Sequence, residues 1–165
     1  MRAILEKIAR WWALLGGAIL LLIALVTVTN AGAFLADRVA RSFGATVSGL
    51  PGYEDFVRLA ISAAALMMIP YCQQRRGHVV IAFFVAKLPA VARRALDRIS
   101  SGAMALLALF LAYWMWLGMA ETEADHALSR VLGWPEWPFY LPGIVSLVLW
   151  GLIAAVQTLE PRGHG

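Results

Sequence analysis

Four long apolar segments limit what this chain can fold into. The first covers residues 11–29 and contains 19 residues without a charged side chain. As a helix it would be about 28 Å long, close to the ~30 Å hydrocarbon core of a bilayer. Three further segments lie at about 53–73, 101–120 and 139–159. The sequence therefore predicts an all-α integral membrane protein, in which residues 1–165 form a single membrane domain with four transmembrane helices.

The composition also favours a lipid environment. Hydrophobic residues make up 61% of the chain, and its mean hydropathy is +0.73, whereas soluble domains are about 45–50% apolar. The net charge of +4 could indicate nucleic-acid binding. However, the basic residues lie beside the apolar segments and form no face interleaved with aromatic side chains. The sequence therefore indicates membrane lipid, and no nucleic acid, as the surroundings of this chain.

Cysteine usage excludes one class of membrane protein. The chain has a single cysteine, Cys72, so it cannot form an intrachain disulfide or act as an oxidoreductase that needs a cysteine pair. A cysteine-based zinc site has no support either. We expect Cys72, at the end of an apolar run, to be an inert packing residue.

The N-terminal segment has two interpretations. Arg2, Lys7 and Arg10 precede its apolar run, and Ala-Gly-Ala at 31–33 resembles a signal-peptidase site. A cleaved signal peptide, however, has an apolar region of only about 7–15 residues. We therefore expect a retained signal-anchor span.

The second apolar segment is the weakest. Its uncharged part, Leu59–Cys72, has only 14 residues, and the full length includes Glu54, Asp55 and Arg58. Because Glu54 and Arg58 are four residues apart, we expect them to pair on one helix face. Pro70 should kink or end this helix near its inner side.

The charge distribution predicts the orientation of the spans. Short loops rich in Lys and Arg remain in the cytoplasm. Ten of the 14 basic residues lie on the side of both termini and the loop at 74–100, and four lie on the other side. We therefore expect a cytoplasmic loop at 74–100 and cytoplasmic N- and C-termini. The basic residues in or beside this loop are Arg75, Arg76, Lys87, Arg93, Arg94 and Arg98.

Two shorter segments resemble interfacial helices. Residues 33–44 alternate apolar side chains with Asp37, Arg38 and Arg41, which suits a short helix lying on the outer interface. Residues 79–92 are apolar but interrupted by charge and proline, and are too short to span a bilayer. The alternative for both is a loop packed on the protein.

Tryptophans mark the expected membrane boundaries, because their rings favour the headgroup region. We expect an inner and an outer belt, formed respectively by Trp11 and Trp12 and by Trp114, Trp116, Trp134 and Trp137.

The predicted spans contain little that could perform chemistry. Their polar residues are few, chiefly Thr27, Thr29, Ser146 and Gln157. A transporter with its own site keeps ionisable groups deep in its spans, and a haem-binding bundle needs histidines there. The sequence therefore disfavours a self-sufficient exporter, which stays a weaker alternative, and predicts no catalytic residue, cofactor or metal site.

An acidic loop leaves a second alternative open. Glu121, Glu123, Asp125 and His126 lie together between the third and fourth spans. A metal site or an enzyme site could be built from such side chains. We favour a solvated loop that helps to set the topology.

Small residues at four-residue spacing favour close helix contacts in lipid. Three such pairs lie in the predicted spans: Ala60 with Ala64, Ala108 with Ala112, and Gly151 with Ala155.

Three sequence elements carry a family resemblance. Glu54-Asp55 with Arg58 opens the second span. Arg75-Arg76-Gly77-His78-Val79 follows it, with Leu88-Pro89 and Arg93-Arg94 further on. A third element, from Pro135 to Gly143, precedes the fourth span and contains Trp137, Tyr140 and Pro142. In this order on four spans, they resemble the small membrane subunit (DctQ-type) of tripartite ATP-independent periplasmic (TRAP) transporters.

The resemblance implies a role in an assembly. It suggests a non-catalytic subunit in the bacterial inner membrane that scaffolds a large permease subunit. That partner would carry the substrate and sodium sites, and a periplasmic binding protein would deliver an organic acid with a carboxylate. We expect His78 to have a structural role after a glycine turn, where it bonds a backbone carbonyl, and contact with the partner is the way in which it would matter. Trp137 and Tyr140 should anchor the interface, and Pro142 should help to set the turn into the fourth span.

Overall fold

A computed structural model describes residues 2–75 and 89–159 of the chain, and most of these residues are helical. Its long helices are α1 (Arg2–Ala40), α2 (Tyr53–Gln74), α4 (Ala90–Ala124) and α5 (Leu141–Leu159). Two 3₁₀ turns, η1 (Arg41–Phe43) and η2 (Trp137–Tyr140), complete the described elements. The four long helices are each long and apolar enough to cross a membrane. This finding confirms the predicted all-α, four-span architecture.

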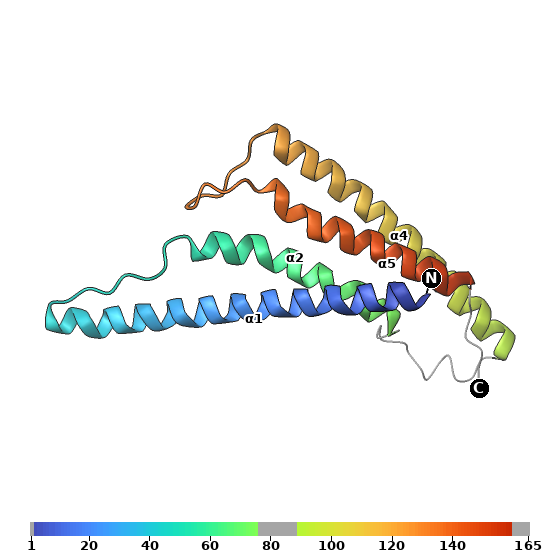
Figure 1. The fold of residues 1–165 in the computed structure, drawn as a ribbon, viewed down its shortest axis with the longest axis horizontal. Helices are drawn as coiled ribbons and strands as arrows, with labels where there is room; N and C mark the ends of the chain where they lie inside the picture. The colour runs from blue at the N-terminus through green and yellow to red at the C-terminus, as the bar shows by residue number, and fades with distance from the viewer. Residues whose placement is uncertain (1, 76–88, 160–165) are drawn as a thin grey trace.

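The four helices form a fan instead of a closed bundle. Figure 1 shows them in the order α1, α2, α5, α4, and the principal contacts join α1 to α2, α2 to α5, and α5 to α4. The most apolar windows of the central α2 and α5 are 33% and 44% buried, against 11% for α1 and 22% for α4. The edge helices therefore expose most of their apolar side chains.

One end of the fan collects the basic residues. The start of α1 packs on α5 through a cluster of Ala9, Leu149 and Ile153, with Leu5 and Trp12 against it. The chain reverses between consecutive helices, so the end of α2 and the start of α4 lie at this same end (Figure 1). Its cations match the positive-inside pattern, and its cytoplasmic location stays a prediction from charge.

Helix α1 continues where a separate interfacial helix was expected. Residues 33–40 extend α1 without a break, and η1 follows, so the prediction for 33–44 is wrong. No proline interrupts this region, and Arg41 pairs with Asp37 one turn earlier at 2.8 Å. The helical run ends at Gly44, whose φ of 75° suits glycine. The 39 residues of α1 make a rod about 58 Å long.

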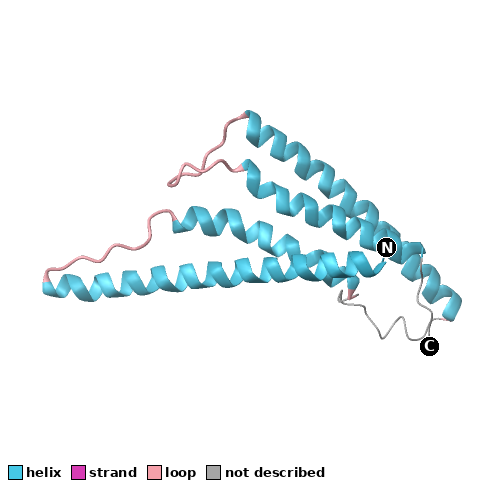
Figure 2. Ribbon diagram, viewed as in Figure 1, coloured by secondary structure: helices cyan, strands magenta, loops and turns pink. Residues whose placement is uncertain are grey.

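The loop at 74–100 is shorter than the charge pattern suggested. Helix α4 begins at Ala90, directly after Pro89 in an extended conformation (φ −61°, ψ 151°), as suits a proline before the first helical turn. Figure 2 shows this first part of α4 as continuous helix. Most of the segment at 79–92 lies outside the described residues, as do Arg76 and His78, but its last three residues belong to α4.

Pro70 does not end α2. The helix continues for four residues past it to Gln74, and the proline is fully buried.

Small residues hold the helices close together, largely as their spacing predicted. Ala60 and Ala64 are buried in α2, and Ala108 and Ala112 are buried in α4. On α5, Gly151 is buried but Ala155 is exposed. Ala154 is buried in its place, because the packed face of α5 follows positions 147, 150, 151 and 154.

Replacing Gly16 with alanine tests the contact between α1 and α2. A Cβ at Gly16 would lie 2.9 Å from the Ala64 carbonyl oxygen and 2.9 Å from Met67 Cβ, and neither atom is the end of a flexible side chain. We expect Gly16→Ala to lower the free energy of unfolding by about 1–3 kcal/mol, the usual cost of overpacking. Denaturation of the full chain in mild detergent, followed by circular dichroism, measures this change.

The neighbouring glycine provides a matched control. A Cβ at Gly17 would meet only Met68 Cε, at 3.7 Å. Gly17→Ala should leave stability unchanged or raise it by up to about 1 kcal/mol through helix propensity. Equal destabilisation by both substitutions would contradict the close approach at Gly16.

Candidate functional site

The N-terminal end of α2 is bonded to the loop before η2. Asp55 is only 4% exposed, and its Oδ2 accepts hydrogen bonds from the backbone N–H groups of Val131 (2.7 Å) and Leu132 (2.9 Å). Gly52, just before α2, has a φ of 75° and lies so close to Leu132 that a Cβ there would meet its side chain. The carboxylate and this glycine together position the loop over the start of α2.

Arg58 forms its ion pair across the fan. Its Nη2 contacts Glu136 Oε1, in the segment leading into η2, so the predicted pair with Glu54 is wrong. The loop held by Asp55 brings Glu136 over the helix, where it is better shielded from solvent than the exposed Glu54. Glu54 instead accepts a hydrogen bond of 3.3 Å from the Tyr53 hydroxyl.

A tryptophan connects α1 to α5 near the middle of the fan. Trp12 Nε1 donates to Ser146 Oγ at 2.8 Å, and Ser146 Oγ donates to the Pro142 carbonyl oxygen at 2.6 Å. Ser146 is buried, and Trp12 packs against the cluster at the start of α1. Trp12 is therefore part of the helix contacts, unlike its neighbour Trp11, which is exposed.

A second polar cluster joins α2 to α5 near the basic end. Gln73 is 3% exposed, and its Nε2 donates to Gln157 Oε1 at 2.8 Å. Its Oε1 accepts from Trp150 Nε1 at 3.1 Å, and its backbone carbonyl accepts from Gln157 Nε2 at 3.1 Å. In lipid a polar group needs a partner within the protein, and these three side chains supply partners to one another.

The third sequence element lies where α4 meets α5. Tyr140 is in η2, and its hydroxyl is 3.4 Å from Thr122 Oγ1 on α4. Trp137 begins η2 and is half-buried. Pro142 is the second residue of α5, where a proline costs no helix hydrogen bond. Their proposed contact with a partner stays a prediction.

The acidic loop does not form a cluster of ligands. Glu121, Glu123, Asp125 and His126 are all exposed at the end of α4. Within residues 2–75 and 89–159, no group of three or more His, Cys, Asp or Glu side chains could hold a metal ion.

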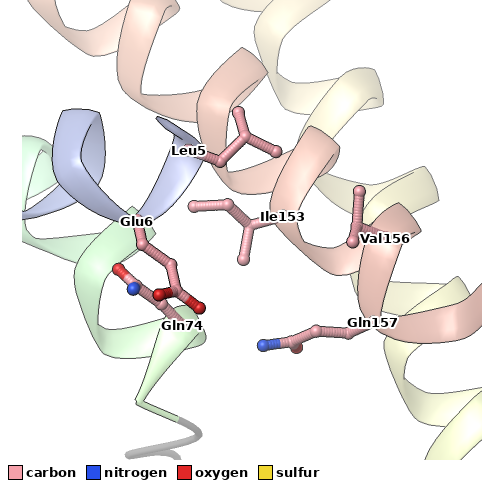
Figure 3. Close-up of a pocket in the computed structure, with 6 residues that line it drawn as sticks. All are labelled: Leu5, Glu6, Gln74, Ile153, Val156 and Gln157. Atoms are coloured by element: carbon pink, nitrogen blue, oxygen red, sulfur yellow. The ribbon is translucent and has the colours of Figure 1, made fainter. Parts of the chain in front are cut away.

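A small cavity between α1, α2 and α5 adjoins the second polar cluster. It is lined by Leu5, Glu6, Gln74, Ile153, Val156 and Gln157, and Figure 3 shows Glu6 and Gln74 side by side. Its volume is about 30 Å³, and a single water needs at least about 10–15 Å³ measured in this way. The cavity has room for a water molecule but not for an organic acid.

A sequence model for one protein family matches residues 31–162 of this chain, and its description reads "Tripartite ATP-independent periplasmic transporters, DctQ component". The chain belongs to the DctQ family. Comparisons with curated proteins and with solved structures found no match. The DctQ component is a non-catalytic part of the transporter, so the enzyme alternative at the acidic loop is wrong. The chain is therefore a small membrane subunit of a TRAP transporter, with several spans suited to the inner membrane.

The DctQ structure brings only some of the predicted residues together. Asp55, Arg58, Trp137, Tyr140 and Pro142 lie around the junction of α2 with η2 and α5, whereas Arg75 and Pro89 lie at the basic end. The buried Gln73 and Asn30 were missed. Gln73 and Asn30 stand next to the ends of predicted spans, and this position is a signal that could have identified them.

Removing the Asp55 carboxylate should release the loop of this DctQ subunit. Asp55→Ala leaves the N–H groups of Val131 and Leu132 without their acceptor, at a cost of about 1–3 kcal/mol. We expect faster trypsin cleavage after Arg130, measured by intact mass spectrometry of the full chain in detergent. Asp55→Asn keeps an acceptor oxygen and should give an intermediate rate.

The exposed neighbour Glu54 gives the control for this experiment. Glu54→Ala removes the same charge from the same helical turn, and the cleavage rate after Arg130 should stay unchanged. Similar acceleration by Glu54→Ala and Asp55→Ala would show that charge, and not the two hydrogen bonds, holds the loop.

A double-mutant cycle tests the contact between Gln73 and Gln157. Interhelical hydrogen bonds in membrane proteins contribute about 0.6 kcal/mol on average and up to about 2 kcal/mol. We expect a coupling energy in this range between Gln73→Ala and Gln157→Ala in denaturation experiments. Thr158→Ala is the matched control because the Thr158 hydroxyl bonds the Ala154 carbonyl oxygen of its own helix, at 2.9 Å. If the coupling energy between Gln73 and Thr158 were as large as that between Gln73 and Gln157, it would contradict the direct hydrogen bond between Gln73 and Gln157.

Proposed function

We propose that this DctQ subunit scaffolds the large permease subunit of a sodium-coupled secondary transporter that imports an organic acid. The observation that carries the proposal is how the buried polar side chains are used. Asn30, Asp55, Gln73 and Ser146 each hydrogen-bond another part of the same chain. Within residues 2–75 and 89–159, these bonds hold the fan together.

The absence of charge within the apolar stretches supports the same proposal. No Asp, Glu, Lys or Arg occurs at 11–36, 59–74, 99–120 or 141–159. Proton- and ion-coupled transport uses ionisable or carbonyl ligands deep within spans. We therefore assign the sodium and carboxylate sites to the large subunit, and substrate choice to a periplasmic binding protein.

The shape of the subunit also suits a scaffold. Leu21, Leu25 and Val28 of α1 are 74%, 63% and 70% exposed. Their spacing of four and three residues places them along one side of the helix. An edge helix with such a stripe offers lipid or a large membrane partner an extended apolar surface for packing.

Reconstitution with the large subunit tests this proposal. Proteoliposomes that contain both membrane subunits should take up the carboxylate when the binding protein and an inward sodium gradient are present. Omission of the small subunit should reduce uptake to the level of empty liposomes. Normal uptake by the large subunit without it would overturn the scaffold role.

A loop variant provides the control for this experiment. Simultaneous alanine substitution of the exposed Glu121, Glu123, Asp125 and His126 should leave both uptake and co-purification of the two subunits unchanged. Loss of uptake with intact co-purification would assign a direct transport role to the acidic loop and contradict the proposal.

A further inference from the structure

We propose that the groove between α1 and α2 at the basic end binds one anionic phospholipid, with its phosphate on Arg10 and Arg75. The groove has a volume of about 630 Å³. Three of its lining residues come from α1 (Arg10, Ala13 and Leu14) and three from α2 (Met68, Tyr71 and Cys72), and the seventh, Arg75, directly follows α2. These two helices lie side by side near the N-terminus (Figure 1).

The two arginines are available for a phosphate. Both are exposed, and among residues 2–75 and 89–159 no carboxylate forms an ion pair with either. Tyr71 orients Arg75, because Arg75 Nε donates to the Tyr71 hydroxyl at 3.1 Å and its guanidinium lies 5.5 Å from the ring centroid. Among the residues that the structure describes, the other N–H groups of Arg75 have no acceptor and can donate to a phosphate. Guanidinium groups bind phosphate oxygens in a bidentate geometry that lysine cannot reproduce.

The groove below these arginines is apolar. Met68 is seven residues before Arg75 on α2 and therefore lies about 10 Å further into the fan. Leu14 and Ala13 follow Arg10 on α1 in the same direction. A ligand with its anionic head on the arginines would thus place a hydrocarbon chain against Leu14 and Met68.

The position of the groove favours a lipid over a soluble anion. Trp11, next to Arg10, is 67% exposed, and exposed tryptophans prefer the headgroup region. Basic pockets between transmembrane helices on the cytoplasmic side bind acidic lipid headgroups. A free phosphate would use the two charges but leave the apolar part of the groove without a ligand.

Cys72 supplies a direct readout of occupancy. It lines the groove, is partly accessible and is the chain's single cysteine. Alkylation of the full chain by N-ethylmaleimide is measured by intact mass spectrometry in detergent with added phosphatidylglycerol, phosphatidylcholine or inorganic phosphate. Phosphatidylglycerol should slow alkylation about tenfold once its concentration is about ten times its Kd. Phosphatidylcholine and inorganic phosphate should not slow it.

Arginine variants test the assignment of the headgroup site. Arg10→Gln with Arg75→Gln should raise the phosphatidylglycerol concentration needed for half-maximal protection by about tenfold to a hundredfold, the loss expected for charge-assisted hydrogen bonds. Arg38→Gln with Arg130→Gln removes two exposed arginines from the opposite end of the fan and should keep full protection. Unchanged helicity and an unchanged alkylation rate in phosphatidylcholine establish that the variants are folded.

Several results would overturn the proposal. Equal protection by phosphatidylcholine would make the groove a general lipid contact, and equal protection by inorganic phosphate would make it an anion site without a lipid. Full protection in the Arg10/Arg75 variant would remove the arginines from the site, and loss of protection in the control variant would reduce the effect to net charge. If the Arg10/Arg75 variant keeps its protection by phosphatidylglycerol but no longer binds the large subunit, the groove is a contact for protein and not for lipid. The lipid comparison on the unaltered chain decides the matter even if the double variant does not fold.

Discussion

Polar groups find no partners in hydrocarbon, and this constraint determines how α2 is held within the fan. At one end, the Asp55 carboxylate accepts hydrogen bonds from two backbone N–H groups of the loop before η2. At the other, Gln73 exchanges hydrogen bonds with Gln157 and Trp150. Between them the helices touch through alanine and glycine. Helix α2 is fixed at both ends. Helix α1 packs on α2 along one side, and the other side of α1 stays uncovered.

The sequence predicted the number and approximate position of the helices, because uncharged runs of bilayer length are strong signals. It also located the small residues at 60, 64, 108 and 112 that are buried between helices. It did not predict that Arg58 would pair with Glu136. The rule for side chains four residues apart on a helix considers neighbours in sequence alone, and Glu136 lies 78 positions away in a loop. The role of Trp12 was also missed, because a tryptophan at a boundary and one in a helix contact look alike in sequence.

The family assignment and the physical description support each other without being the same argument. Membership of the DctQ family rests on residues 31–162. The fan adds the apolar surface on which we propose that the large subunit packs. Its hydrogen bonds are directed inward along a chain of helix pairs, and its apolar surface remains open at the edges. A protein built in this way can stabilise a neighbour while its own polar groups remain occupied.

The two edge helices extend beyond their apolar stretches in opposite directions. Helix α1 runs for eleven residues past position 29, and α4 begins eleven residues before position 101. Each extension is about 16 Å long. Tilting alone cannot place all of α1 within the hydrocarbon core. A 58 Å helix would have to tilt by about 60° from the bilayer normal to fit a 30 Å core, and observed tilts stay below about 40°. The two extensions lie at opposite ends of the fan, and in a bilayer they would give one small subunit a contact with each aqueous compartment.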